Sequence, residues 1–317
     1  MRPARIALVC ALFHGASSAA GPSLTALGTQ HGTDKVAQGF TEVYTSLFEL
    51  HRKATKLGLP PPALDRLGVQ RMMEIGVFRG ASIKMWRDWL PNATIYGVDA
   101  FRGEMGWLNK KGPRKGKPLT FSGFEDFKRE VDAGDHGPRV RVLQADQANA
   151  SQMVAMAQTL LDSVGSSFDL IVDDGSHKFR DQLESLSQLL PLVRPGGVYV
   201  IEDTHSSLQG GYDLPSMHPE TTRRALERWK ASGSLTSRYL SSEQAAEIER
   251  WVESWSRHTP KGQPTGPAAW RSTETTIFRK RLGPRTSSTA TATGSAATGA
   301  STADGDAPKV SYFVWGL

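Results

Sequence analysis

Two short apolar runs in the chain each end in a pair of carboxylates. The runs are 170–172 and 198–201, and the pairs are Asp173 with Asp174 and Glu202 with Asp203. Both runs have strand character, and the carboxyl ends of strands in a doubly wound sheet form the ligand-binding crevice. We therefore expect both acidic pairs to face one site.

Carboxylates that meet at one site repel one another and raise each other's pKa unless a cation lies among them. A hard divalent cation with oxygen ligands removes this repulsion and keeps positions open for water or substrate. His177, three residues after Asp174, is a candidate general base beside such a cation. His205 is a candidate substrate contact. The plainer alternatives are carboxylates that cap helices and histidines without a catalytic role.

Composition excludes several classes of protein. With 38% hydrophobic and 22% charged residues, the 317-residue chain has the make-up of a globular protein. It holds no run of about 20 apolar residues that could span a membrane. The net charge of +6 is concentrated in the loop 102–119 and lacks an aromatic RNA-binding motif, so we expect no nucleic-acid partner. Cys10 is the only cysteine, which excludes an intramolecular disulfide and a cysteine-ligated zinc site.

The middle of the chain alternates between strand-like and helix-like segments. Strands are expected at 72–77, 95–98, 140–143, 170–172 and 198–201, and helices at 82–90, 124–131, 150–161 and 179–192. Such alternation predicts an α/β fold, a doubly wound and mostly parallel sheet with helices on both faces. Towards the C-terminus we expect helices at 220–232 and 243–258 and an edge hairpin formed by 275–278 and 310–315.

Five segments are expected along the chain. Residues 1–23 form a candidate leader, 24–66 a helical segment, 67–285 the catalytic core, 286–306 a disordered insertion without large apolar side chains, and 307–317 a final strand of the core. The leader has early arginines, an apolar run and small residues, which is typical of secretory or organelle targeting. Without such targeting the protein would be cytoplasmic.

Glycines and carboxylates at the first two strands indicate a nucleoside-containing cofactor. Gly76 and Gly80 lie where the first strand turns into a helix, and Asp99 ends the second strand, where a carboxylate can bind ribose hydroxyls. A nicotinamide fingerprint would need a glycine at Phe78, so pyrophosphate binding is disfavoured.

The spacing Glu74-x-Gly76-x-x-x-Gly80 resembles the first motif of class I S-adenosylmethionine (SAM)-dependent methyltransferases. The resemblance implies a seven-stranded Rossmann-like sheet with SAM as the cofactor. It also implies a set of cofactor-binding residues, with Asp99 at the ribose and the turn 144–147 at the adenine: Glu74, Gly76, Gly80, Asp99 and Asp146. Asp173 is a further candidate that either orients the cofactor or caps a helix.

More narrowly, DDGSH followed by VRPGGVYVIED is similar to the metal-dependent macrolide sugar O-methyltransferases of the mycinamicin and demethylmacrocin type. The similarity covers about residues 70–205, with the GTDK segment at 32–35 as weaker support. It implies Mg²⁺ held by Asp174, Glu202 and Asp203, with His177 as base. The implied reaction is O-methylation of a sugar, glycoside or polyketide-like hydroxyl.

Two other classes of function stay open on the sequence alone. The acidic cluster could serve a metal-dependent hydrolase or nucleotide-sugar enzyme, or the fold could be a non-catalytic binding module. The loop 102–119 is a candidate lid over the crevice, with Trp107 placed to stack on a sugar, or else a solvated loop. The expected partner is a small hydroxylated substrate, and assembly into a homo-oligomer is compatible with this reading.

Overall fold

The computed structural model describes residues 21–56, 64–102, 123–209, 214–215, 218–260 and 273–285. Several predicted features lie outside these residues. They are the leader up to residue 20, Trp107 and the basic loop beyond Arg102, the insertion 286–306 and the final strand 307–317. In the part of the chain that the structure describes, no helix has the length and apolar character needed to cross a bilayer.

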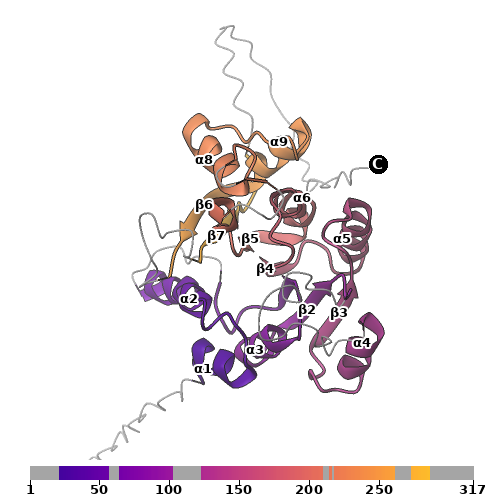
Figure 1. Cartoon of the computed structure of the whole chain (residues 1–317). Coiled ribbons are helices and arrows are strands. Elements are labelled where there is room, and N and C mark those ends of the chain that lie inside the picture. Colours follow the sequence, from indigo (N-terminus) through magenta and orange to yellow (C-terminus); the bar gives the residue numbers. More distant parts are fainter. Residues whose placement is uncertain are drawn as a thin grey trace, which may run out of the picture.

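A single mixed sheet forms the centre of the fold (Figure 1). Its strands are β1 Arg71–Ile75, β2 Thr94–Asp99, β3 Val140–Gln144, β4 Phe168–Asp173, β5 Val193–Ile201, β6 Val252–His258 and β7 Thr275–Lys280. They lie in the order β3-β2-β1-β4-β5-β7-β6; β1 to β5 pair in parallel, and β7 is antiparallel to both of its neighbours. The predicted seven-stranded, mostly parallel sheet is confirmed.

Helices cover both faces of this sheet. One face packs against α1 Leu24–His31, α2 Phe40–Lys56, α3 Ala81–Trp89 and α4 Phe124–Asp132. The other packs against α5 Ala150–Val164, α6 Phe179–Leu189, α8 Thr222–Ser232 and α9 Ser242–Trp251. The short elements η1 Leu190–Leu192 and α7 Ser206–Gln209 complete the described helices. Each core is continuous across its face, so the two layers and the sheet form one unit.

The alternation of side chains along each strand decides which layer a residue enters. In β1, Met72 belongs to the core on the α1–α4 face and Met73 to the core on the α5–α9 face. Glu74 follows Met72 by two positions and therefore points towards α3, where Ser82 donates a hydrogen bond to it. The same alternation divides the carboxylates at the strand ends between the two faces of the sheet.

The structure corrects one element and adds another. The predicted helix 243–258 is wrong beyond Trp251, because 252–258 form β6 and pair with β7. The apolar residues Val252 and Trp255 are three positions apart, as on a helix face, but a register shift between Val252 and Ser254 lets both pack on the core, so strand pairing outweighs helix propensity. Helix α1 lies within the predicted helical segment 24–66, although its bounds were not predicted; Ser23 caps its first turn and Gly32 ends it with φ of 73°.

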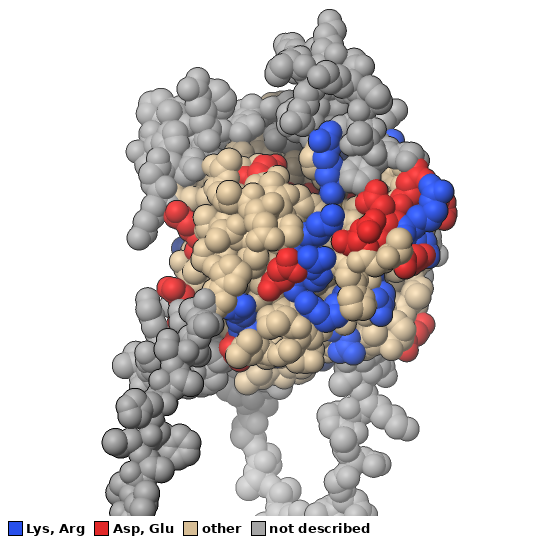
Figure 2. Space-filling model, turned by 90° about the horizontal axis from the view of Figure 1, so that it is seen from below, with Lys and Arg blue, Asp and Glu red and all other residues tan. Residues whose placement is uncertain are grey.

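Acidic and basic side chains lie next to one another on the face seen in Figure 2. Ion pairs along α3 and α4 join Arg87 with Asp88, Arg129 with Asp126, and Lys128 with Asp132. Exposed pairs of this kind contribute little to stability.

Candidate functional site

Backbone strain marks the edge of the sheet formed by the carboxyl ends of β1 to β5, which we call the C-terminal edge. The non-glycine residues with positive φ are Phe78, Phe101, His177 and Asp203 among the described residues. They follow β1, β2, β4 and β5 respectively. Such conformations cost free energy and collect at functional sites, so the strain and the crevice rule point to the same edge.

Asp99 organises the turn at which the first motif meets the second strand. Its Oδ2 accepts hydrogen bonds from the backbone N–H groups of Val77, at 2.9 Å, and Phe78, at 3.1 Å. Its Oδ1 accepts the N–H of Phe101 at 2.8 Å. These bonds leave carboxylate lone pairs available to hydroxyl groups of a ligand, as the predicted ribose role requires.

The two motif glycines have structural reasons as well. Gly76 has φ of 92°, and a Cβ there would lie 2.0 Å from the carbonyl oxygen of Asp174. At Gly80, with φ of 71°, a Cβ would lie 2.9 Å from atoms of Phe127 and His136. The close approach at Gly76 joins the β1 and β4 loops, so the glycine brings the cofactor motif against the acidic stretch. Cofactor contact by both glycines stays a prediction.

The other predicted cofactor residues lie in different surroundings. Glu74 is fully buried below the edge, where Ser82 and Trp86 donate to its carboxylate. Asp146 is at the end of β3, accepts the N–H of Ala148 and forms an ion pair with Arg102. Of these two residues Asp146 is the more exposed, and its contact with the adenine stays a prediction.

Asp173 turns towards the face that carries α5 and α6. It accepts hydrogen bonds from Gln147 at 2.7 Å and from Tyr199 at 3.3 Å, and burial raises its pKa to about 7. Gln147 also accepts the N–H of Ser176 at 2.7 Å, and so links the turn after β3 to the loop after β4. In the structure, Asp173 supports the loop that carries Asp174 and His177.

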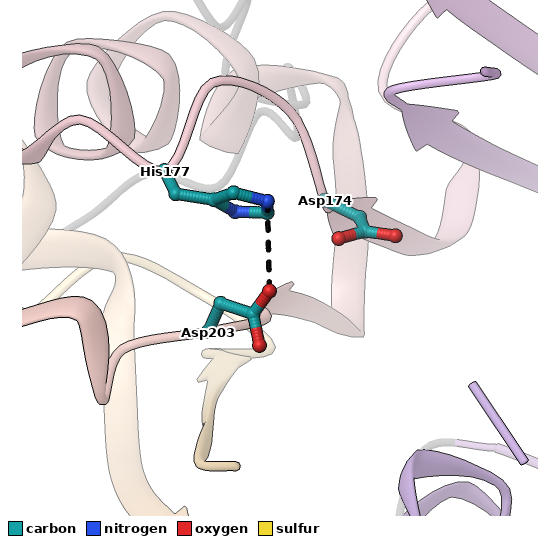
Figure 3. A group of neighbouring side chains, drawn as sticks. All are labelled: Asp174, His177 and Asp203. Atoms are coloured by element: carbon teal, nitrogen blue, oxygen red, sulfur yellow. Dashed lines mark ion pairs between the residues drawn. The ribbon is translucent and has the colours of Figure 1, made fainter. Parts of the chain in front are cut away.

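Asp174, His177 and Asp203 converge from the loops after β4 and β5 (Figure 3). One ligand atom from each lies within 4.8 Å of the others, and His177 Nε2 is 3.5 Å from Asp203 Oδ2. Their side chains keep exposed fractions of 22%, 24% and 12%. A charged yet partly accessible group of this kind can receive a cation from solvent.

Asp203 offers a further sign that this site accepts a cation. Its buried Oδ1 has no hydrogen-bond partner among the described residues, and the nearest ionisable atom, His205 Nδ1, is 3.4 Å away. Burial raises the pKa of Asp203 to about 6, although His177 opposes the shift. The same burial lowers the pKa of His205 to about 4, with His177 adding to it. An uncompensated carboxylate oxygen beside a second carboxylate fits a hard divalent cation.

Glu202 does not join this group, in contrast to the trio of ligands that the resemblance implied. It is fully buried, one of its oxygens is 2.7 Å from Lys35 Nζ, and the other accepts the hydroxyl of Tyr44. Glu202 shares its strand parity with Val200 and so points into the α1–α4 layer. The structure thus gathers Asp174, His177 and Asp203, whereas both Glu202 oxygens contact the N-terminal segment.

Lys35 is the site residue that the sequence interpretation missed. Its ammonium is 2.6 Å from Asp174, 2.7 Å from Glu202 and 3.1 Å from Glu74, and its side chain is 1% exposed. Burial lowers the pKa of Lys35, but these three carboxylates outweigh it and hold the pKa well above its ordinary value. The sequence offered one hint of this contact. The GTDK segment at 32–35 ends in Lys35, a charged residue that precedes the largely apolar face of α2.

Comparison with known proteins finds a methyltransferase family model and several sugar O-methyltransferases similar to this chain. Residues 73–204 match the family model of a methyltransferase domain. Among curated relatives, a rhamnosyl tetracenomycin-C 2'-O-methyltransferase of Streptomyces olivaceus is 29% identical over 61% of this chain and 41% of its own. Mycinamicin VI 2''-O-methyltransferase of Micromonospora griseorubida is 28% identical over 60% of this chain and 38% of its own. The chain thus spans about two fifths of the length of these relatives.

A solved structure of MycE, a methyltransferase of the mycinamycin pathway in complex with Mg and SAH, is also similar. It has a TM-score of 0.49 and 22% identity, and the match covers 82% of this chain and 55% of that one. Demethylmacrocin O-methyltransferase of Streptomyces fradiae is 26% identical over 45% of this chain and 29% of its own. The family match and the curated relatives confirm the resemblance to methyltransferases of this type.

Proposed function

We propose that the protein is a SAM-dependent, Mg²⁺-dependent O-methyltransferase that acts on a hydroxyl of a sugar or glycoside, since residues 73–204 match the family model of a methyltransferase domain. The observation that carries the proposal is the convergence of Asp174, His177 and Asp203 at the edge that also bears Asp99. One carboxylate is thereby available to the cofactor ribose. The other two are available to a cation next to a base.

The chemistry divides between the bound groups and the protein. SAM supplies a methyl group already activated by its sulfonium, and a divalent cation lowers the pKa of a hydroxyl beside it. His177 accepts the hydroxyl proton at Nε2, a step that typically contributes ~10²- to 10⁴-fold to rate. Asp203, 3.5 Å from that nitrogen, stabilises the histidine once it is protonated.

The proposed acceptor class rests on the curated relatives. The tetracenomycin, oleandolide and mycinamicin enzymes are named for methylation of sugar positions on larger molecules. A vicinal pair of hydroxyls suits such a site, since two adjacent oxygens can chelate one hard cation. We therefore propose a vicinal diol of a glycoside as the acceptor.

A transfer assay tests the proposal. Purified protein is incubated with methyl-labelled SAM and a panel of hydroxylated glycosides, with Mg²⁺ or with EDTA. We expect labelled product only with Mg²⁺, and mass spectrometry should locate the label on a sugar oxygen. If titration calorimetry detects no SAM binding, the acidic cluster serves another class of enzyme, such as a hydrolase, and the proposal is wrong.

A further inference from the structure

The segment that joins α1 to α2 carries an ammonium group into the C-terminal edge. Lys35 contacts Glu74 from β1, Asp174 from the loop after β4 and Glu202 from the end of β5. Glu74 lies 39 positions after Lys35 in the sequence, and Asp174 and Glu202 lie 139 and 167 positions after it. One side chain therefore joins three strand ends to the N-terminal segment.

Buried carboxylates at such short separations need a compensating charge. Glu74 and Glu202 are fully buried, so neither can rely on water for solvation. An ammonium group within hydrogen-bond distance of both supplies that charge and at the same time fixes where their oxygens point. Removing one partner of such an arrangement leaves the rest uncompensated.

Asp174 belongs to two groups at once. Its Oδ2 is 2.6 Å from the Lys35 ammonium, and the same carboxylate lies within the cluster that includes His177 and Asp203. The orientation of Asp174 towards the proposed cation is thus coupled to the position of Lys35. Tyr44 fixes the orientation of the Glu202 carboxylate, because its hydroxyl donates a hydrogen bond to that group.

We propose that Lys35 is a positioning residue for the divalent-cation site, acting through Asp174 and Glu202, with Tyr44 as its support. This inference rests on the proposed function, because it assumes that the acidic edge binds a cation. It extends the reaction centre to residues 35–44, ahead of the matched methyltransferase domain. Groups that hold metal ligands in place commonly contribute 10- to 100-fold to metal affinity.

The test measures Mn²⁺ affinity by calorimetry with the full chain, without SAM or acceptor. We expect Lys35→Met to weaken Mn²⁺ binding 10- to 100-fold, while SAM affinity changes less than about 3-fold. Lys280→Met is the matched control, because Lys280 is also buried but contacts the backbone carbonyls of Leu190, Pro191 and Val193 instead of carboxylates. The control should keep wild-type Mn²⁺ affinity.

Tyr44→Phe provides a second variant in case Lys35→Met fails to fold. It removes one hydroxyl and keeps the aromatic packing against Trp86, so its circular dichroism should match the wild type. We expect Mn²⁺ affinity to fall about 3- to 10-fold, the equivalent of one lost hydrogen bond. Lys35→Arg keeps the charge and should recover part of the affinity that Lys35→Met loses.

The outcomes separate this inference from the proposed function. If the wild type binds Mn²⁺ and a folded Lys35→Met or Tyr44→Phe variant binds it equally well, the positioning role of Lys35 is refuted and the proposed function stands. If the wild type binds SAM but no Mn²⁺, both the cation site and the role of Lys35 are refuted.

Discussion

The two halves of the C-terminal edge hold their carboxylates in different ways. At β1 and β2, Asp99 accepts three backbone N–H groups from the turns around it. At β4 and β5, Asp174 and Glu202 contact the ammonium of Lys35, and Asp203 faces His177. Backbone groups hold Asp99, whereas Asp174 and Glu202 depend on a side chain that comes from a distant segment.

This difference has a consequence for how each half responds to substitution. Backbone donors remain when a neighbouring side chain is changed, so the Asp99 half should tolerate most nearby substitutions. The acidic half loses its partner whenever one side chain is removed, and an unpaired buried charge is costly. The predictions below change one half at a time and ask whether the other half responds.

Removal of the base should have the largest effect. His177→Ala is expected to lower turnover by ~10²- to 10⁴-fold, because it removes the proposed proton acceptor. SAM affinity, measured by calorimetry, should stay within about 3-fold of the wild type. His205→Ala is the matched control, since His205 also contacts Asp203 but with its pKa lowered to about 4. Unchanged turnover in His177→Ala would show that the base is wrong.

Loss of a proposed cation ligand should weaken cation binding and leave SAM affinity unchanged. Asp203→Asn is expected to weaken Mn²⁺ binding by more than ~100-fold, because loss of a supporting residue alone costs 10- to 100-fold. Titration of Mn²⁺ and of SAM on the same sample measures both halves. A parallel loss of SAM affinity would contradict the independence of the two halves.

Substitution in the cofactor half should give the reverse pattern. Asp99→Ala is expected to weaken SAM binding by about 10- to 100-fold, as expected for hydrogen bonds to a charged group. Mn²⁺ affinity should not change. Asp99→Asn keeps one acceptor oxygen and should lose less. If Asp99→Ala abolished Mn²⁺ binding while the protein stayed folded, the halves would not be separable.

The smallest effect on the site is expected from Lys280, the last residue of β7, whose ammonium contacts the backbone at the start of β5. Burial lowers the pKa of Lys280 to about 8 from an ordinary 10.5. Between these pH values the unfolded chain binds more protons than the folded one, so the free energy of unfolding should rise with pH, by about 1 to 3 kcal/mol. Denaturant titrations from pH 8 to 10.5 measure this, and Lys280→Met should lack the rise. A wild-type stability that falls relative to the variant over this range would reverse the sign.

The fold could be predicted because its signals are local. The apolar runs that end at Asp99 and Asp173 became β2 and β4, and the carboxylates at strand ends met at one edge. Strand β6 could not be recognised in the same way, because residues 252–258 depend on pairing with β7 rather than on their own propensity. Local patterns therefore gave the parallel strands and the antiparallel strand β7, and missed β6, which takes the place next to β7 that had been predicted for 310–315.

The candidate site was predicted in part for a related reason. Asp174, His177 and Asp203 lie close to one another in the sequence and at equivalent places in the fold. Lys35 is 139 residues from Asp174, and no periodicity connects them. Because the contact with Lys35 could not be foreseen, Glu202 was predicted as a cation ligand, whereas in the structure its carboxylate contacts Lys35. A contact between distant segments that depends on charge leaves no pattern in either segment alone.

A crystal structure of the full chain with Mn²⁺ and SAH would test the central claim most directly. We predict one anomalous peak at coordination distance, about 2.0 to 2.3 Å, from oxygens of Asp174 and Asp203. SAH should lie on the same edge with its ribose at Asp99. No peak at these carboxylates at saturating Mn²⁺, or an SAH molecule bound away from β1 and β2, would contradict the account.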